Sequence, residues 1–421
     1  MLATGYAMIE IRNSIRPIKI LRLIARLNIG GPAIQAITLS SFRLGDQYET
    51  LLVCGDINPG EGDMSYLAIE QGVRPHVIKA IQRKISLFGD LKSLWEIRKI
   101  IKGFQPQIIH THTAKAGTLG RFAALTIGIP FLSARKFRLV HTFHGHTFHS
   151  YFNRLKTLAF IQIERILAGF SDKIIVISKK QKEDICHRYK IADEKKVRII
   201  SLGFDLSKFS EINIRCNNSE KTNANRSSSK PFRAGLVGRL TDVKNPFLFL
   251  QAAHCLKDMG KIDCFRFDVV GDGELRDRAI AAAEKLDVRD SVLFRGWQKN
   301  MASVYSKLGA VALTSKNEGT PVAIIEAMAS SRPVIAAAVG GVPDLIGNII
   351  EKKTDGFQIA ERGLSVPSGD ARALAGALLF VFNNMSSLEP MVRRAKEFVL
   401  TNYSQDRLLK EISMLYDELA Y

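Results

Sequence analysis

Residues 310–336 carry the sequence AVALTSKNEGTPVAIIEAMASSRPVIA. A short apolar run stands at each end of this stretch, at Ala310–Leu313 and at Pro333–Ala336, and an apolar helical pattern surrounds Glu326 in its second half. Short apolar strands that alternate with helices are typical of parallel α/β sheets, in which each helix connects two strands. The stretch therefore predicts one strand–helix–strand unit.

The same alternation runs through the rest of the chain in two series. The first series ends before the segment Glu211–Lys230, which is rich in Asn, Ser, Lys and Thr and has almost nothing to bury. The second series begins after this segment, which is therefore interpreted as an exposed, mobile connection. The predicted strands are Ile18–Ile24, Tyr48–Val53, Ile108–His110, Leu139–Phe143 and Lys173–Ile177 in the first series, and Phe232–Val237, Phe265–Val270, Val292–Phe294, Ala310–Leu313 and Pro333–Ala336 in the second.

The two series predict an α/β protein with two Rossmann-like, doubly wound parallel-sheet domains that face each other across a cleft. We assign residues 1–200 to the first domain, 201–230 to a hinge and polar linker, and 231–400 to the second domain. The segment Tyr403–Leu419 has leucines at helical spacing, so residues 401–421 are predicted to form a docking helix. Doubly wound sheets bind ligands at the carboxyl ends of their strands, where the candidate site residues are therefore sought.

The composition indicates a soluble globular protein with anionic ligands. Of the 421 residues, 46% are hydrophobic and 24% are charged, and the formal net charge is +19. A positive field attracts phosphates, whether they belong to a nucleic acid, an acidic membrane leaflet or a pyrophosphate substrate. The cysteines are scattered without C-x-x-C spacing, which argues against disulfides or structural zinc and favours a reducing cytosol. No apolar run reaches the roughly 20 residues of a membrane-spanning helix, so any membrane contact is expected to be peripheral.

Two loops that follow predicted strands carry groups suited to phosphate. Gly30 and Gly31 follow the first strand and precede a helical stretch, where backbone N–H groups can approach an anion. A plain strand-to-helix turn explains these glycines equally well. Arg239 and Lys244 follow the strand Phe232–Val237, and their cations can neutralise a diphosphate leaving group. A solvated basic loop is the alternative interpretation of this pair.

The two glutamates Glu318 and Glu326 carry the strongest signal. They stand eight positions apart, a spacing that would place them about two turns apart on one face of a helix. Gly319 and Thr320 offer backbone N–H groups at the start of that helix, a position suited to a phosphate. Glu326 lies among apolar residues, so we expect it to meet a ligand hydroxyl or a basic side chain, because an unpaired buried carboxylate is costly.

A cluster of histidines follows two adjacent predicted strands. Imidazole is a common ligand of transition metals, so a metal site is one interpretation. The cluster has no nearby Cys, Asp or Glu to complete a ligand shell, and a polar cleft wall with one general base is favoured instead. The cluster comprises His110, His112, His141, His144, His146 and His149.

Together these motifs resemble retaining glycosyltransferase family four, of the GT-B fold, and the resemblance covers nearly the whole chain. Its most specific mark is the E-x7-E pair Glu318/Glu326 within N-E-G-T-P and E-A-M. The N-terminal half, with His141-Thr-Phe-His-Gly-His, resembles subfamilies that build bacterial surface polysaccharides. The other landmarks are the pair Arg239 and Lys244, Val270-Gly-Asp-Gly273-Glu, Phe294-Arg-Gly296-Trp297 and Gly340-Gly341-Val-Pro343.

The resemblance implies transfer of a sugar from a nucleotide-sugar donor, with UDP as the expected nucleotide, to a glycan or lipid-pyrophosphate-linked acceptor. Glu326 would bind the ribose hydroxyls, Glu318 would face the donor sugar, and His144 would be the cleft histidine. Arg239 and Lys244 would stabilise the departing diphosphate, so that neither a metal ion nor another cofactor is expected. The donor site would be completed by Gly30, Gly31, Gly319 and Thr320.

Retention of the anomeric configuration requires either a covalent sugar intermediate or departure and attack on one face of the sugar. No carboxylate of the sequence is obviously placed as a nucleophile, so the front-face route is favoured. In this hypothesis an oxygen of the leaving phosphate helps to take the proton of the acceptor.

Basic residues of the N-terminal half predict where the acceptor binds. A lipid-pyrophosphate-linked sugar at the cytoplasmic membrane face would use their charge. The stretch Ile85–Phe104 places Leu87, Leu91, Leu94 and Ile101 on one helical face, which could assist at an anionic membrane surface, although a core helix is the preferred interpretation. The basic residues are Arg12, Arg16, Lys19, Arg22, Arg26, Lys79, Arg83 and Lys84.

Two other functions stay open. A sugar-nucleotide epimerase or hydrolase of the same architecture would consume the donor without any acceptor. A basic, non-catalytic nucleic-acid-binding protein would use the net charge, but the sequence has no aromatic stacking stripe and no recognition helix. The sequence therefore predicts no nucleic-acid partner.

Overall fold

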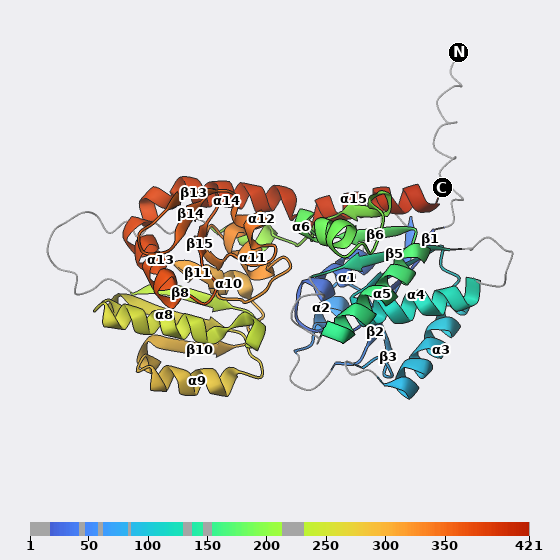
Figure 1. Cartoon of the computed structure of the whole chain (residues 1–421), viewed down its shortest axis with the longest axis horizontal. Coiled ribbons are helices and arrows are strands. Elements are labelled where there is room, and N and C mark those ends of the chain that lie inside the picture. The colour runs from blue at the N-terminus through green and yellow to red at the C-terminus, as the bar shows by residue number, and fades with distance from the viewer. Residues whose placement is uncertain are drawn as a thin grey trace, which may run out of the picture. The chain divides into compact units, whose positions relative to one another are not determined.

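The chain forms two compact units, each with one sheet (Figure 1). The computed structural model describes residues 17–41, 47–57, 62–82, 86–128, 137–145, 154–212 and 231–420. Unit 1 comprises Met1–Val176, Glu183–Arg198 and Leu409–Tyr421, and unit 2 comprises Ile177–Lys182 and Ile199–Leu408.

Unit 1 is built on a seven-stranded sheet with the order β3-β2-β1-β4-β5-β6-β7. The strands are β1 Ile18–Ile24, β2 Tyr48–Gly55, β3 His76–Ile78, β4 Ile108–His112, β5 Arg138–Phe143, β6 Lys173–Val176 and β7 Val197–Ile199. The pairs from β3 through β6 are parallel. The strand order reverses between β1 and β4, so the carboxyl ends of these two strands flank the ligand-binding edge of this sheet.

Alternating side chains of β1 decide which helices cover each face of this sheet. The first helices of the chain are α1 Gly31–Ser41, α2 Ser65–Glu70, α3 Leu87–Phe104, α4 Ala114–Gly128, α5 Arg154–Phe170 and α6 Lys179–Glu183. Leu21 and Leu23 join a core with Ile97 of α3 and Ala123 of α4. Ile24 belongs to a separate core cluster with Ile37 of α1. The even-numbered positions of β1 therefore face α1, and Arg22 is one of them.

Unit 2 is built on an eight-stranded sheet with the order β10-β9-β8-β11-β12-β15-β14-β13. The strands are β8 Phe232–Val237, β9 Phe265–Val270, β10 Val292–Gly296, β11 Ala310–Leu313, β12 Val334–Ala337, β13 Ile349–Lys352, β14 Gln358–Ala360 and β15 Leu364–Val366. Neighbours from β10 to β15 are parallel, whereas β14 and β13 add an antiparallel edge. The order reverses between β8 and β11, and the loops after these two strands therefore meet.

The remaining helices include the one that closes the chain. They are α7 Ser207–Ser210, α8 Pro246–Asp258, α9 Arg276–Lys285, α10 Met301–Tyr305, α11 Val322–Ala329, α12 Val342–Ile346, α13 Ala371–Asn384, α14 Glu389–Asn402 and α15 Gln405–Ala420. The residues of α15 up to Leu408 group with unit 2, and those from Leu409 onwards group with unit 1. Two leucines of its helical pattern, Leu408 and Leu415, are buried. Among the described residues, no helix combines the length and the apolar character that a membrane span requires.

The predicted fold class of parallel, Rossmann-like sheets is confirmed. Strands β1, β8, β9 and β11 begin and end at the predicted residues. Strands β3, β7, β14 and β15 were not predicted, because three residues are too few to show a periodic pattern, and β13 was not predicted either. The antiparallel edge was also not predicted, since β13 is exposed along its whole length and lacks the apolar signature of a buried parallel strand. Residues 213–230 of the predicted linker lie outside the described residues.

Candidate active site

The candidate site of unit 2 forms where the loops after β8 and β11 meet. The side-chain hydroxyl of Thr314 donates a hydrogen bond of 2.8 Å to the carbonyl oxygen of Lys244. The backbone amide of Lys316 donates one of 2.8 Å to the carbonyl oxygen of Val243. These bonds hold the loop of Lys244 against the loop that carries Glu318, which is 74 positions away in the sequence.

Lys244 and Glu318 form an ion pair within this site. Nζ of Lys244 lies 2.5 Å from Oε1 of Glu318, and the hydroxyl of Ser315 donates to the same oxygen at 2.6 Å. The Glu318 side chain is 8% exposed and that of Lys244 is 31% exposed, so the pair is shielded on its carboxylate side. Lys244 is thus held in one place by a buried anion, which argues against the alternative of a solvated basic loop.

Arg239 lies in the same loop as Lys244, and one of its donors is buried without a partner among the described residues. Its Nε atom is buried and has no hydrogen-bond partner among the residues that the structure describes. A buried N–H group without a partner costs free energy, and such groups are commonly satisfied by a ligand or an ordered water. Arg239 therefore supplies a cation whose donors are not committed within this loop.

Gly340 and Gly341, which follow β12, pack directly against the backbone of the Glu318 loop. An added Cβ on Gly340 would lie 1.8 Å from the carbonyl oxygen of Glu318, and one on Gly341 would lie 2.1 Å from that of Gly319. The amide of Gly341 donates a 3.2 Å hydrogen bond to the Glu318 carbonyl oxygen. The Gly340-Gly341 landmark of the sequence is therefore a backbone contact that fixes the position of Glu318.

Replacing Gly340 with alanine is expected to destabilise unit 2 by about 3 kcal/mol or more and to weaken ligand binding at this site. The new Cβ would displace the Glu318 backbone, a cost of about 1–3 kcal/mol, and the φ of +55° adds about 1–2 kcal/mol. Gly369→Ala is the matched control, because Gly369 has a φ of +86° but no atom within 4 Å of an added Cβ. Thermal unfolding of both variants separates the two effects. Equal losses in stability would show that the contact with Glu318 is not tight.

Glu326 lies on α11 and is paired with a tyrosine of α10. The hydroxyl of Tyr305 donates a 2.9 Å hydrogen bond to Oε2 of Glu326. Burial raises the pKa of Glu326 to about 7, although the hydrogen bond from Tyr305 opposes this rise. We expected a ligand hydroxyl or a basic partner, and the structure instead provides a neutral hydroxyl as its partner. Tyr305 was missed because nothing in the sequence around it marks it as a partner of Glu326.

The two glutamates do not share a helix face, so this part of the sequence analysis was wrong. Helix α11 begins at Val322, after Pro321 at its N-cap position, and Glu318 lies in the preceding loop. Proline favours the first turn of a helix and cannot continue one from before it, which explains this start. Gly319 and Thr320 lie in the same loop, immediately before the helix.

The glycines of the first predicted phosphate loop start helix α1 of unit 1. Gly31 is the first residue of α1, and Gly30 precedes it with a φ of +154°. The backbone amide of Met64 donates a 2.8 Å hydrogen bond to the carbonyl oxygen of Leu27, and that of Ile29 donates one of 3.3 Å to the carbonyl oxygen of Gly62. These two bonds anchor the loop. Gly30 and Gly31 thus stand at a helix N-terminus, and their predicted contact with a diphosphate stays a prediction.

Three of the four described histidines of the predicted cluster lie side by side, and the fourth, His141, lies apart from them. Strand alternation puts His110 and His112 on one face of the sheet, where His112 Nδ1 lies 2.8 Å from His144 Nε2. His141 lies on the other face, where its Nδ1 is 2.8 Å from the Thr111 hydroxyl. His146 and His149 lie outside the described residues. Among the described residues, no three His, Cys, Asp or Glu side chains are grouped so that they could hold a metal ion.

Arg22 departs from its predicted place. It was counted among the basic residues that attract an acceptor, but it is fully buried under α1 and α15. A buried guanidinium contributes little to a surface that a ligand can reach. Lys19 keeps 40% of its side-chain surface, and the residues Arg12, Arg16, Arg83 and Lys84 lie outside the described part of the chain.

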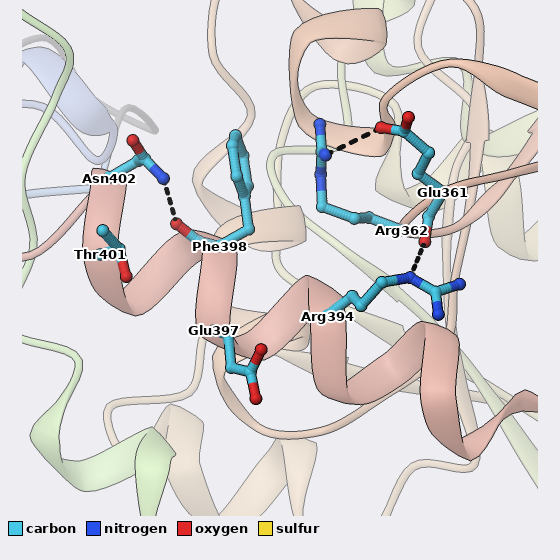
Figure 2. Close-up of a pocket in the computed structure, with 7 residues that line it drawn as sticks. All are labelled: Glu361, Arg362, Arg394, Glu397, Phe398, Thr401 and Asn402. Carbon is cyan, nitrogen blue, oxygen red and sulfur yellow. Dashed lines mark hydrogen bonds and ion pairs between the residues drawn. The ribbon is translucent and has the colours of Figure 1, made fainter.

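Each unit has a hollow among its described residues. In unit 1, a cavity of about 180 Å³ lies at the carboxyl ends of β1 and β4, the edge where the strand order reverses. It is lined by Ala25, Arg26, Gln82, Thr113 and Lys115. In unit 2, a hollow of about 400 Å³ lies on α14, where the guanidinium of Arg362 stacks on the ring of Phe398 (Figure 2). The second hollow shares no residue with the candidate site.

Members of one enzyme family are similar to this chain over most of its length. The family described as Glycosyltransferase Family 4 matches residues 29–208, and Glycosyl transferases group 1 matches residues 217–398. The UDP-Gal:alpha-D-GlcNAc-diphosphoundecaprenol alpha-1,3-galactosyltransferase of Escherichia coli is 31% identical, with 77% of this chain and 80% of that protein aligned. The capsular polysaccharide biosynthesis glycosyltransferase CapM of Staphylococcus aureus is 25% identical over 81% of this chain and 84% of that protein. The Anabaena protein HepE in complex with UDP-glucose shares the fold, with a TM-score of 0.71, 17% identity and coverage of 95% and 99%.

Proposed function

The chain belongs to glycosyltransferase family 4, and from this we propose that it is a retaining enzyme that moves a sugar from a UDP-sugar to a lipid-pyrophosphate-linked glycan. One observation carries the donor half of the proposal: Lys244, Glu318 and Arg239 are brought together in the loops after β8 and β11. The acceptor half rests on the 31% identical relative, whose name describes transfer to GlcNAc-diphosphoundecaprenol.

The charges of the site suit a departing diphosphate. As the bond between sugar and UDP breaks, negative charge develops on the phosphate, and fixed cations lower the barrier by stabilising it. Lys244 is held in place by Glu318, and Arg239 has an uncommitted donor. These two cations supply the electrostatic role that a magnesium ion plays in other sugar transferases, and we therefore propose a reaction without a metal or other cofactor.

Glu326 is proposed to bind the ribose of UDP. A carboxylate can accept hydrogen bonds from two neighbouring hydroxyls, and Oε2 of Glu326 is already oriented by Tyr305. The orienting bond comes from a buried tyrosine, so it costs no rearrangement when the ligand arrives. The backbone amides of Gly319 and Thr320, just before α11, are proposed to contact the phosphates.

A front-face route is proposed for retention of configuration. Glu318 is engaged by Lys244 and Ser315, and Glu326 is engaged by Tyr305, so neither carboxylate is a free nucleophile. In this route the bond from the anomeric carbon to the UDP oxygen breaks, and the acceptor oxygen forms its bond on the same face. The acceptor proton goes to the released phosphate oxygen.

Calorimetric titration with UDP, GDP and ADP tests the donor half. We expect UDP to bind more tightly than the other two, with the same affinity in the presence and absence of EDTA, because the two cations hold the diphosphate directly. Turnover of a UDP-sugar only when a lipid-pyrophosphate-linked glycan is added tests the acceptor half. Consumption of the donor without an acceptor would instead favour the epimerase or hydrolase, and the absence of binding by any nucleotide would contradict the proposal.

The variant Glu326→Gln tests the ribose contact, and the direction in which UDP affinity changes with pH tests it independently. If only the ionised carboxylate binds the ribose hydroxyls, a pKa of about 7 makes UDP affinity rise about tenfold between pH 6 and pH 8. The same raised pKa favours the protonated form in the folded state, so its contribution to folding stability falls as the pH rises from about 4.5 through about 7. In Glu326→Gln the UDP affinity should be low, and its remaining pH dependence should be that of the phosphate alone.

Helix α3 is proposed to contact an anionic membrane surface. Its residues Leu87, Phe88, Leu91 and Trp95 are 74%, 85%, 57% and 63% exposed, whereas Ile97 is buried in the core. Leu87, Leu91, Leu94 and Ile101 were predicted to share one helical face, with a core helix preferred. Leu87 and Leu91 are exposed, whereas Ile101 is buried in the core. Exposed lysines of the same helix accompany this apolar patch, a combination that is typical of helices at a lipid interface. The exposed lysines are Lys92, Lys99 and Lys102.

The double variant Phe88→Ser/Trp95→Ser is expected to bind phosphatidylglycerol-containing vesicles at least about tenfold more weakly than the unchanged protein. Each exposed aromatic that enters the interface contributes roughly 1.5 kcal/mol or more. Vesicle co-sedimentation measures the change, and added salt should weaken binding further because the lysines contribute. Ile350→Ser, at a 62% exposed position of unit 2, is the matched control. If all three proteins bind vesicles equally, α3 does not contact the membrane surface.

A further inference from the structure

A buried guanidinium lies at the centre of unit 1 with neutral groups around it. Arg22 is fully buried, and none of its described hydrogen-bond partners is a carboxylate. Its Nε donates to the Ser40 hydroxyl at 3.2 Å and its Nη2 donates to the Leu39 carbonyl oxygen at 3.1 Å. Its Nη1 faces the Tyr416 hydroxyl at 2.9 Å and two histidine nitrogens. All three residues that Nη1 faces belong to unit 1, as does Arg22 itself.

Arg22 determines where the proton of each neighbouring imidazole is. A guanidinium offers only N–H donors and does not lose its charge in proteins, so any nitrogen that it faces has to accept. Its Nη1 lies 3.0 Å from His110 Nδ1, which therefore carries no proton. The proton of His110 is then on Nε2, which donates to the Thr142 hydroxyl at 2.7 Å. The Tyr416 hydroxyl accepts from Arg22 and donates to His110 Nδ1 at 2.6 Å, which fits the same assignment.

The same reasoning extends through His112 to His144. Nη1 of Arg22 lies 3.5 Å from His112 Nε2, a longer contact in which the nitrogen again has to accept. The proton of His112 is then on Nδ1, which donates to His144 Nε2 at 2.8 Å. In the opposite arrangement, the N–H group on His112 Nε2 would point at an N–H group of Arg22. A neutral His144 that accepts on Nε2 carries its own proton on Nδ1.

The Nδ1 atom of His144 is the free end of this chain of bonds. It is buried and has no hydrogen-bond partner among the described residues, although the ring as a whole is partly exposed. His144 directly follows strand β5, at the carboxyl edge of the sheet where ligands bind. Burial lowers the pKa of His144 to about 3, and burial together with Arg22 lowers the pKa of His110 well below its usual range. Burial, with the neighbouring His110, also lowers the pKa of His112 well below its usual range, so all three rings are neutral near pH 7, as the chain of bonds requires.

We propose that Arg22, acting through His112, fixes the proton of His144 on Nδ1, so that His144 donates a hydrogen bond to a substrate oxygen and does not act as a general base. Its lone pair on Nε2 is occupied by the His112 proton, and Nδ1 has no lone pair to take a proton from the acceptor. Arg22 and His112 are positioning residues in this scheme, and Tyr416 of α15 supports Arg22. That the oxygen belongs to a sugar or phosphate rests on the proposed function, but the position of the proton does not.

Nuclear magnetic resonance of the full chain labelled with 15N-histidine tests the inference directly. Long-range proton–nitrogen correlation at pH 7 distinguishes an imidazole that is protonated on Nδ1 from one that is protonated on Nε2. The signals of His144 are assigned by their loss in His144→Asn. We expect His144 and His112 to be protonated on Nδ1 and His110 on Nε2. A proton on Nε2 of His144, or a charged ring, would overturn the proposal.

Two variants show whether Arg22 is the cause. Arg22→Met removes the donor that faces His112, and the His112–His144 pair should then change from one tautomer to a mixture of both. Tyr416→Phe leaves the Arg22 donor in place, so the tautomer of His144 should stay unchanged. If Arg22→Met does not fold, the spectrum of the unchanged protein still decides the position of the proton. A protein that binds UDP but shows Nε2 protonation refutes this inference alone, and one that shows Nδ1 protonation without binding UDP refutes only the proposed function.

Discussion

Replacing Lys244 with methionine is expected to lower kcat for sugar transfer by about 10²–10³-fold, the effect of removing one preorganised group that stabilises charge in a transition state. Nζ of Lys244 lies 2.5 Å from Glu318 Oε1, in the loops that carry the candidate diphosphate site. In the proposed mechanism, loss of the ammonium leaves Arg239 alone to stabilise the charge on the leaving phosphate. Initial rates at saturating UDP-sugar and acceptor measure the loss.

Lys316→Met is the matched control for this prediction. Lys316 lies in the same pair of loops and also pairs with a carboxylate, Asp242 at 2.8 Å, but the two side chains are 51% and 79% exposed. Screened surface pairs contribute about 0–1 kcal/mol, so kcat should change little. The variant Glu318→Gln separates two roles for Lys244. If Lys244 only orients Glu318, then Lys244→Met should cost nothing further in the Glu318→Gln background, and the direct role at the diphosphate would be excluded.

Replacing Glu164 with leucine is expected to destabilise unit 1 by about 3–5 kcal/mol. Nη2 of Arg121 lies 2.7 Å from Oε2 of Glu164, and neither side chain is exposed. Burial raises the pKa of Glu164 while Arg121 opposes the rise, so the carboxylate depends on its partner to stay charged. The single substitution would leave the Arg121 cation buried without a carboxylate. The shift in the midpoint of urea unfolding measures the loss.

The double variant Arg121→Met/Glu164→Leu is expected to recover most of that stability. Apolar residues of similar volume can replace a buried ion pair without loss, because the desolvation cost of two charges is removed together with their attraction. Glu49→Leu is the surface control, since Glu49 and Lys19 are 47% and 40% exposed in their pair. It should shift the midpoint by no more than about 1 kcal/mol of stability. A Glu164→Leu loss as small as that of Glu49→Leu would show that water reaches the buried pair.

The candidate site could be found from the sequence as a set of loops. Arg239, Lys244 and Glu318 all lie in loops that follow strands, where the alternation of apolar runs and helical stretches had put them. The position of such a loop depends only on local pattern, because apolar runs form strands and a Pro or Gly ends or starts the neighbouring helix. The prediction that Glu318 and Glu326 share a helix used only their spacing and overlooked Pro321. Helix α11 begins after this proline, so Glu318 lies outside it.

The contacts within the site could not be found in this way. Tyr305 reaches Glu326 across 21 positions, and Lys244 reaches Glu318 across 74. Neither pair follows from periodicity, because strand order and loop packing decide which distant residues meet. The same limit applies to glycines. The sequence marks Gly340 as part of a landmark shared with the family, but only the carbonyl oxygen of Glu318, at 1.8 Å from an added Cβ, explains why glycine is required there.

The amino-acid sequence by itself determined two parallel α/β sheets, the loops that carry the site and the family to which the chain belongs. Only the tertiary structure decided which charges are buried and which partners they have. Arg22 reads as one of many basic residues, yet the alternation of β1 turns it inward, where Tyr416 of the last helix reaches it from 394 positions away. The physical reason is that hydrophobic periodicity acts over a few residues, whereas a buried polar group has to be satisfied by whatever groups the completed fold brings to it.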